Sequence, residues 1–124
     1  MGKGTPRRPA LLVLGPAADF EEIRRQLASF ELITAISTAA AVAALRAAPV
    51  AAAVVLAEVS TAAIEELLAA VDRSRPGIPV LAVRRRNAEE PVSWRARAVG
   101  VLREPLLPEA LARSISAVLG LRQT

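Results

Sequence analysis

The sequence predicts an α/β protein in which five parallel strands alternate with helices. Short apolar runs, bounded by turn-forming residues, recur along the chain, and the central run over residues 50–59 has no polar alternation before Glu58. Such a run is typical of a strand that is covered on both faces. The segments between the runs carry apolar residues at helical spacing, and the short loops favour right-handed parallel crossovers. Ligands of open α/β sheets bind beyond the carboxyl ends of the strands, so we expect functional residues at the end of the central run.

Each predicted element has its own signal. We expect strands over residues 10–14, 32–36, 50–59, 78–83 and 101–103. Asp19 can cap the first helix, Ser37 or Thr38 the second over residues 39–48, and Ser60 or Thr61 the third, which residues 73–77 close. A fourth helix is expected from Pro91 to about Val99, and a last one from Pro108 until Gly120 ends it.

Length and charge predict one domain with a short tail. A chain of 124 residues supports a single core, which we place over residues 10–121, and residues 1–9 form a flexible basic tail. The net charge is +4, but without Lys3, Arg7 and Arg8 only 13 of the 16 basic residues remain against 12 acidic ones. The body is therefore almost neutral, which argues against a nucleic-acid-binding domain.

Composition excludes several chemistries. The chain has no cysteine and no histidine, so it lacks disulfides, thiol catalysis and the commonest metal ligand and general base. No base, nucleophile and orienting group stand together at any strand end, and we expect no enzymatic activity, metal or cofactor. No apolar run is long enough to span a membrane and no signal peptide is recognisable, so a cytoplasmic location is expected.

Two stretches resemble receiver domains of two-component response regulators, the CheY-like family. Ile78-Pro79-Val80-Leu81 is similar to the fourth strand of that family, and residues 100–111 are similar to its closing stretch, including Glu104-Pro105. The first strand and helix match in spacing through Leu27. The resemblance implies a flavodoxin-like (βα)5 sandwich with sheet order 2-1-3-4-5, a bacterial signalling role, and a cis peptide bond before Pro105.

The residues that a working receiver needs are missing at the matching positions. The family uses an acidic pair for a divalent cation, an aspartate that accepts the phosphoryl group, a hydroxyl residue and a lysine. The acidic pair falls on Gly15 and Pro16, and the aspartate on Leu56 or Ala57. The hydroxyl position holds Arg84 and the lysine position Glu104. The resemblance therefore implies a pseudo-receiver with a vacated phosphorylation pocket, near which Glu58 is either a surrogate acid or, more simply, a solvated loop residue.

Several residues allow two readings. Arg84 and Glu104 either form an ion pair across the vacated pocket or are both solvated. The run Arg84–Arg86 binds phosphate or an acidic partner, or is a solvated loop. Trp94 packs on the edge of the core or anchors an interface.

Three functions follow from these patterns. The first is phosphorylation-independent binding of a protein partner, or of a second copy, through the fourth helix, fifth strand and fifth helix. The residues expected on that face include Trp94, Val101 and Arg103. The second is a nucleic-acid-associated module that uses the basic tail and Arg84–Arg86. The third is a small-molecule sensor in the vacated pocket.

Overall fold

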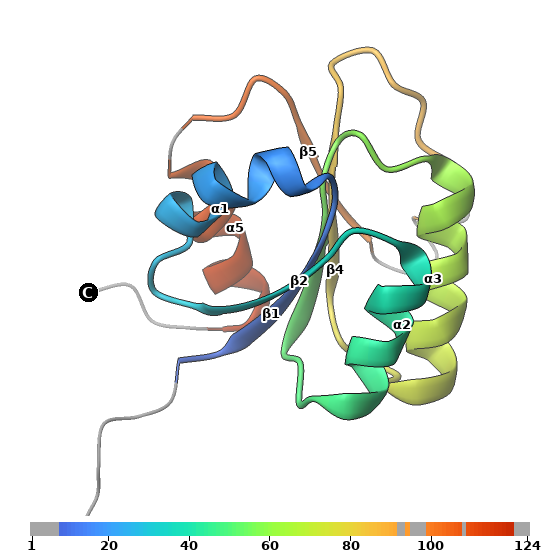
Figure 1. Cartoon of the computed structure of the whole chain (residues 1–124). Coiled ribbons are helices and arrows are strands. Elements are labelled where there is room, and N and C mark those ends of the chain that lie inside the picture. Colours follow the sequence, from blue (N-terminus) through green and yellow to red (C-terminus); the bar gives the residue numbers. More distant parts are fainter. Residues whose placement is uncertain (1–7, 92–93, 95–98, 108, 121–124) are drawn as a thin grey trace, which may run out of the picture.

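The computed structural model describes residues 8–91, 94, 99–107 and 109–120, and forms a three-layer α/β sandwich (Figure 1). Its elements are β1 (Ala10–Leu14), the short 3-10 helix η1 (Ala17–Asp19), α1 (Phe20–Gln26), β2 (Glu31–Ala35), α2 (Thr38–Ala47), β3 (Ala52–Val55), α3 (Thr61–Ser74), β4 (Val80–Arg84), β5 (Gly100–Arg103) and α5 (Ala110–Val118). The five strands form one parallel sheet in the order β2-β1-β3-β4-β5. The predicted fold class and strand order are confirmed.

Alternate residues of each strand feed two separate cores. Leu12 and Leu14 of β1 pack on the face covered by α2 and α3. Leu11 and Val13 pack on the other face, which α1 and α5 cover. Strand side chains alternate between the two faces of the sheet. The core that a strand residue faces therefore determines the face of the residues after it, up to the carboxyl end of the strand.

Most helix starts agree with the predictions. The Ser37 hydroxyl accepts from the amide of Ala40 at 3.1 Å, and the Ser60 hydroxyl accepts from the amide of Ala63 at 3.2 Å. These bonds satisfy amides that the first turn leaves free. The cap predicted for Asp19 is wrong, because its side chain makes no capping hydrogen bond after the turn of η1.

The central strand is shorter than the apolar run that predicted it. β3 covers only Ala52–Val55, and the amide of Val59 bonds back to the carbonyl of Leu56 in a turn. Leu56 still bonds to β1 through its amide and is 4% exposed. The apolar character of the later residues thus reflects burial at the sheet edge rather than strand continuation.

Smaller differences concern the other boundaries. β2 begins and ends one residue earlier than predicted, and Ile36 beyond it is 70% exposed. β4 starts at Val80, after Pro79, and extends to Arg84. Most of the predicted fourth helix lies outside the described residues, as do Pro108 and residues 1–7 of the predicted tail. Arg8 donates to the carbonyl of Ala28, so the described end of that tail contacts the domain.

Candidate functional site

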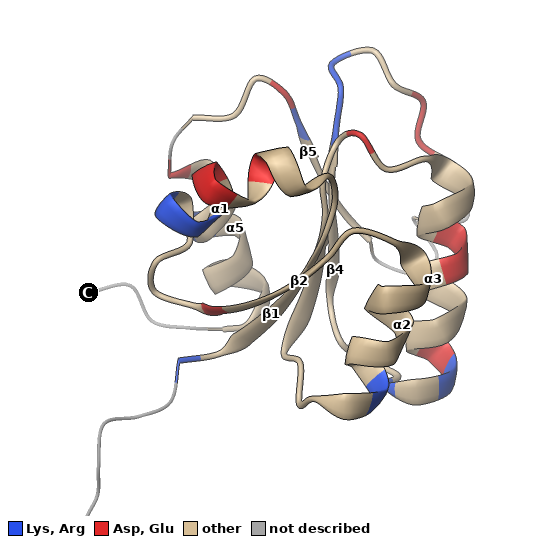
Figure 2. Ribbon diagram, viewed as in Figure 1, with Lys and Arg blue, Asp and Glu red and all other residues tan. Residues whose placement is uncertain are grey.

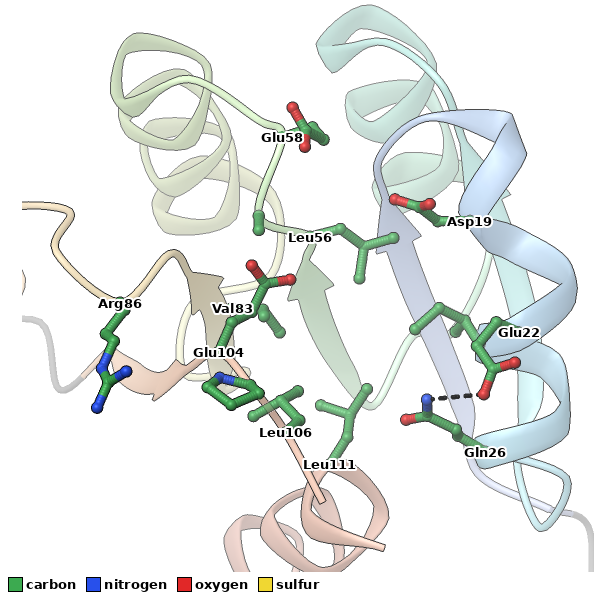
Figure 3. Close-up of a pocket in the computed structure, with 13 residues that line it drawn as sticks. Asp19, Glu22, Gln26, Leu56, Glu58, Val83, Arg86, Glu104, Leu106 and Leu111 are labelled. Carbon is green, nitrogen blue, oxygen red and sulfur yellow. Dashed lines mark hydrogen bonds between the residues drawn. The ribbon is translucent and has the colours of Figure 1, made fainter. Parts of the chain in front are cut away.

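A cavity of about 610 Å³ opens at the carboxyl edge of the sheet. It lies between α1, the ends of β3 and β4, and the loop from β5 to α5 (Figure 3). This is the edge at which ligands of open α/β sheets bind. Of the seven residues predicted for the vacated pocket, four line this cavity: Leu56, Ala57, Glu58 and Glu104.

The floor of the cavity is apolar. Leu56, which directly follows β3, projects to the same face as Val54 and fills the space above Gly15. A Cβ atom at Gly15 would lie 2.6 Å from Leu56 Cδ1 and 2.8 Å from Leu56 Cβ. The floor also contains Ile23, Val83, Leu106 and Leu111. The leucine therefore occupies the space in which any side chain from position 15 would have to lie.

The rim of the cavity is acidic. Glu22 of α1 accepts from Arg25 and from Gln26, the latter at 3.1 Å. These hydrogen bonds, that of Arg25 first, hold the pKa of Glu22 below its ordinary value, so the carboxylate is charged at neutral pH. Asp19 and Glu104 also line the rim, and in the part of the chain that the structure describes neither carboxylate has a hydrogen bond or ion pair.

Glu58 is held by a neighbouring cation. Its carboxylate pairs with the guanidinium of Arg85 at 2.5 Å, and both side chains are more than half exposed. The hydrogen bond with Glu58 raises the pKa of Arg85 above its ordinary value. An exposed pair of this kind contributes little to stability. Glu58 therefore behaves as a paired surface acid on the rim.

Arg84 faces the opposite side of the sheet from the cavity. In the register of β4 and β5 it pairs with Arg103, so Glu104, one residue further, projects to the other face. The Arg84 guanidinium donates to the carbonyl of Val59 at 3.2 Å and to the hydroxyl of Thr61 at 3.3 Å. The predicted ion pair with Glu104 is wrong, because strand alternation separates the two side chains.

Trp94 is a core residue. Its side chain is fully buried in the cluster shared with α2 and α3, and its indole N–H donates to the carboxylate of Glu65 at 2.6 Å. The Arg84 guanidinium lies 5.5 Å from the centre of its ring. The prediction that Trp94 anchors an interface is therefore wrong, and the alternative prediction, that it packs on the core, is confirmed.

The other two residues predicted for the interaction face, Val101 and Arg103, make contacts within the domain. Val101 is half-buried against the same cluster as Trp94. Arg103 donates to the carbonyls of Arg85 and Ala88 and lies 3.5 Å from the carboxylate of Glu90. Arg103 thereby braces the loop that follows β4.

The run Arg84–Arg86 is not a continuous basic patch. Arg84 is 8% exposed and Arg85 is paired with Glu58, so within the described residues Arg86 alone of the three has no bonded partner. Figure 2 shows this basic segment next to acidic residues of the neighbouring loops. The arrangement weakens the case for a phosphate-binding surface, which needs several exposed cations.

Two further searches of the described ranges gave negative results. No group of three or more acidic side chains in residues 8–91, 94, 99–107 and 109–120 is arranged to hold a metal ion. No helix in the same part of the chain is long and apolar enough to cross a membrane.

Comparison with solved structures identifies the architecture. The chain superimposes on the chemotaxis response regulator CheY4 of Vibrio cholerae with a TM-score of 0.75 at 18% identity, over 90% of this chain and 98% of that one. The CheY-like receiver domain of Methanospirillum hungatei gives 0.75 at 16% identity, over 91% and 94%. A receiver domain of Clostridium thermocellum gives 0.76 at 13% identity, over 90% and 94%.

The chain has the fold of response-regulator receiver domains. No protein-family model and no curated protein matches its sequence. The cavity lies at the carboxyl edge of this fold, beside the ends of β3, β4 and β5, and the peptide bond between Glu104 and Pro105 is cis, as the resemblance implied.

Sequence reasoning missed the wall that α1 contributes. Asp19, Glu22, Ile23 and Gln26 all line the receiver-fold cavity. Their spacing is that of one helix face, so the signal was present in the sequence. The signal is weak because Ile23 belongs to the apolar stripe of the helix, and acids beside such a stripe are ordinarily solvated.

Proposed function

We propose that this receiver-fold domain acts in signal transduction by binding a protein partner without being phosphorylated. The family resemblance assigns the cation-binding acidic pair to Gly15 and Pro16 and the phosphorylated aspartate to Leu56 or Ala57. None of these side chains can ligate a hard cation or accept a phosphoryl group. The residues at these positions therefore do not fit a magnesium ion.

The observation that carries the proposal is the packing of Leu56 over Gly15. Atoms Cβ, Cγ and Cδ1 of Leu56 all lie within 3 Å of the position that a side chain at residue 15 would occupy. Hydrocarbon therefore fills the space between the ends of β1 and β3. A phosphoryl group and its cation require oxygen ligands and charge neutralisation at that place.

The residues at the ends of β4 and β5 support the same conclusion. A phosphoryl group is anionic and is stabilised by donors and cations. Glu104 brings a carboxylate to this edge, and the guanidinium of Arg84 is engaged with Val59 and Thr61 on the opposite face. The edge thus repels an anion where the family would bind one.

The partner-binding surface is proposed on the α5 side of the domain. Leu107, in the loop after β5, is 73% exposed, and Val118 of α5 is 45% exposed. Large apolar side chains that remain exposed are candidates for a protein interface. These two residues replace Trp94 as the proposed anchors, with either a different protein or a second copy of the chain as the partner.

The phosphorylation experiment uses acetyl phosphate and magnesium. The purified chain is incubated with both and its intact mass is measured, alongside a receiver domain that retains the acidic pair and the aspartate. We expect the mass of this chain to stay unchanged while the control gains one phosphoryl group. A stoichiometric phosphoryl adduct on this chain would contradict the proposal.

The interface experiment compares three serine substitutions. Leu107→Ser and Val118→Ser should reduce recovery of a partner in affinity capture, or reduce dimerisation in sedimentation at increasing concentration. Ile36→Ser is the matched control, because Ile36 is 70% exposed but lies at the opposite side of the sheet, beyond β2. Equal effects of all three substitutions would place the interface elsewhere.

A further inference from the structure

The cavity at the carboxyl edge has the size and lining of a small-molecule site. Its volume of about 610 Å³ lies within the range of ligand pockets, roughly 300 to 1,000 Å³. Its floor consists of leucine, isoleucine and valine side chains from the carboxyl edge of the sheet and from the layer formed by α1 and α5. A ligand that occupies this part of the cavity must therefore have an apolar body.

The polar groups around the opening are predominantly hydrogen-bond acceptors. Four carboxylates line the cavity, those of Asp19, Glu22, Glu58 and Glu104, against one guanidinium, that of Arg86. Figure 3 shows Asp19 and Glu104 on either side of Leu56, whereas Arg86 lies across the opening from α1. A ligand that complements this rim carries donors and a positive charge.

Two of these four carboxylates have no bonded partner within the described chain, although Glu104 interacts with Arg85 through longer-range electrostatics. The carboxylates of Asp19 and Glu104 make no hydrogen bond or ion pair there. The Oε1 atom of Gln26, on the same wall, is buried and accepts no hydrogen bond, although its amide nitrogen donates to Glu22. The Gln26 oxygen has almost no accessible surface and is out of reach of a ligand, whereas carboxylates that line the cavity without a bonded cation favour a ligand that brings donors and positive charge.

We infer that the cavity binds a small organic ammonium compound, whose apolar body fills the floor and whose charged group lies at the acidic rim beside Asp19 and Glu104. An ammonium group brings three donors and one positive charge. A bare metal ion is a poorer match, because no three acidic side chains of the described residues converge as ligands. An anion is repelled by the four carboxylates.

The inference goes beyond the proposed function, since a domain that binds a protein partner need not bind an amine. It also stands independently of partner binding, because the cavity lies between α1 and the β5–α5 loop, whereas the proposed anchors Leu107 and Val118 are not among its lining residues.

The test compares three probes that share a phenethyl body and differ in their polar group. Phenethylamine, phenethyl alcohol and hydrocinnamate are titrated into the full chain, and binding is followed by the NMR shifts of the leucine methyl groups. We expect the amine to bind more tightly than the alcohol, to shift the methyl signals of Leu56 and Leu111, and to weaken as salt is added. The carboxylate should bind least.

Isosteric variants locate the charged group. Glu104→Gln and Asp19→Asn should each weaken amine binding by roughly three- to tenfold, while affinity for the alcohol stays within about twofold. Glu21→Gln is the matched control, because Glu21 is an exposed acid of α1 that does not line the cavity. It should leave the affinity for the amine unchanged within about twofold.

Three outcomes would overturn the inference. They are binding of none of the probes, equal affinity for the amine and the alcohol, and equal effects of Glu104→Gln and Glu21→Gln. A phosphoryl adduct in the separate acetyl phosphate experiment would instead contradict the proposed function and would leave the amine result to be judged on its own.

Discussion

The guanidinium of Arg84 lies 5.5 Å from the centre of the Trp94 ring, on the side of the sheet that faces α3. The same guanidinium donates to Val59 and Thr61, and the indole of Trp94 donates to Glu65 of α3. One charged residue at the end of β4 thereby ties together the β3–α3 loop, α3 and the segment that contains Trp94. This network lies behind the sheet edge, on the other face from the cavity.

Replacement of Arg84 by alanine should destabilise the domain by about 1 to 3 kcal/mol. The substitution removes two hydrogen bonds, one contact between a cation and an aromatic ring, and the packing of the long side chain. Unfolding in urea, followed by circular dichroism, measures the loss. Arg86→Ala is the matched control, because Arg86 is exposed, and it should change the free energy of unfolding by less than about 0.5 kcal/mol.

Equal effects of the two substitutions would show that the Arg84 network contributes nothing to stability. Arg84→Lys refines the test. A lysine keeps the charge but presents a compact ammonium in place of a planar fork, so it cannot reproduce the stacked, two-acceptor arrangement. Its stability should lie between those of the original chain and the alanine variant.

The fold and the cavity were predictable to different degrees. Each strand could be predicted from its own apolar run, and the helix starts at Ser37 and Ser60 from the capping chemistry of serine. Both signals depend on only a few adjacent residues. Whether Arg84 and Glu104 share a face depends on the register between β4 and β5, which pairs Arg84 with Arg103, 19 positions away in the chain. The match of Arg84 to a pocket position of the family was therefore a poor guide to the direction of its side chain.

Trp94 illustrates a second limit. A single tryptophan beside a polar loop is compatible with either core packing or an interface, because its amphipathic ring suits both. The choice depends on whether an acceptor is available for its N–H inside the fold. Glu65 of α3, which lies 29 positions before Trp94 in the chain, supplies that acceptor.

Replacement of Glu65 by alanine should cost about 1 to 3 kcal/mol, because the fully buried indole N–H of Trp94 would lose its acceptor. Since Trp94 is the only tryptophan, its fluorescence reports the change directly. We expect a shifted emission maximum together with a lower urea midpoint. Glu66→Ala, at the exposed neighbouring position of α3, should leave both unchanged. An unshifted spectrum in Glu65→Ala would contradict the assigned hydrogen bond.

The carboxylate of Glu22 provides a pH-dependent prediction. Its pKa in the folded chain is below the ordinary value, chiefly because Arg25 donates a hydrogen bond to it. The folded state therefore favours the ionised form, and the resulting stabilisation is present above the unfolded-state pKa and lost as the pH falls through the folded-state pKa. Arg25→Ala should raise the pKa of Glu22 toward its ordinary value, as measured by carbon-detected NMR titration. Arg24→Ala is the control, and an unchanged Glu22 titration in Arg25→Ala would refute the assignment.

The packing of Leu56 over Gly15 predicts a coupled pair of substitutions. Gly15→Ala should destabilise the domain by about 1 to 3 kcal/mol, because the new methyl group would meet Leu56 Cβ at 2.8 Å as well as Cδ1 at 2.6 Å. A rotation of the leucine tip relieves the contact with Cδ1 but not the contact with Cβ.

Leu56→Ala alone should cost about 2 to 5 kcal/mol through the space that it opens. In the double variant the contacts of the new methyl with Cγ and Cδ1 are gone and only the contact with Cβ remains, so the combined loss should be smaller than the sum of the two single losses. Gly100→Ala is the control. There a Cβ atom would meet only the tip of Leu81, Cδ2 at 2.5 Å, with Cγ at 3.6 Å, so a side-chain rotation can relieve the contact and the cost should be lower than at Gly15. Additive losses at Gly15 and Leu56 would show that the two residues are not in contact, and the hydrocarbon filling of the sheet edge would then need another source.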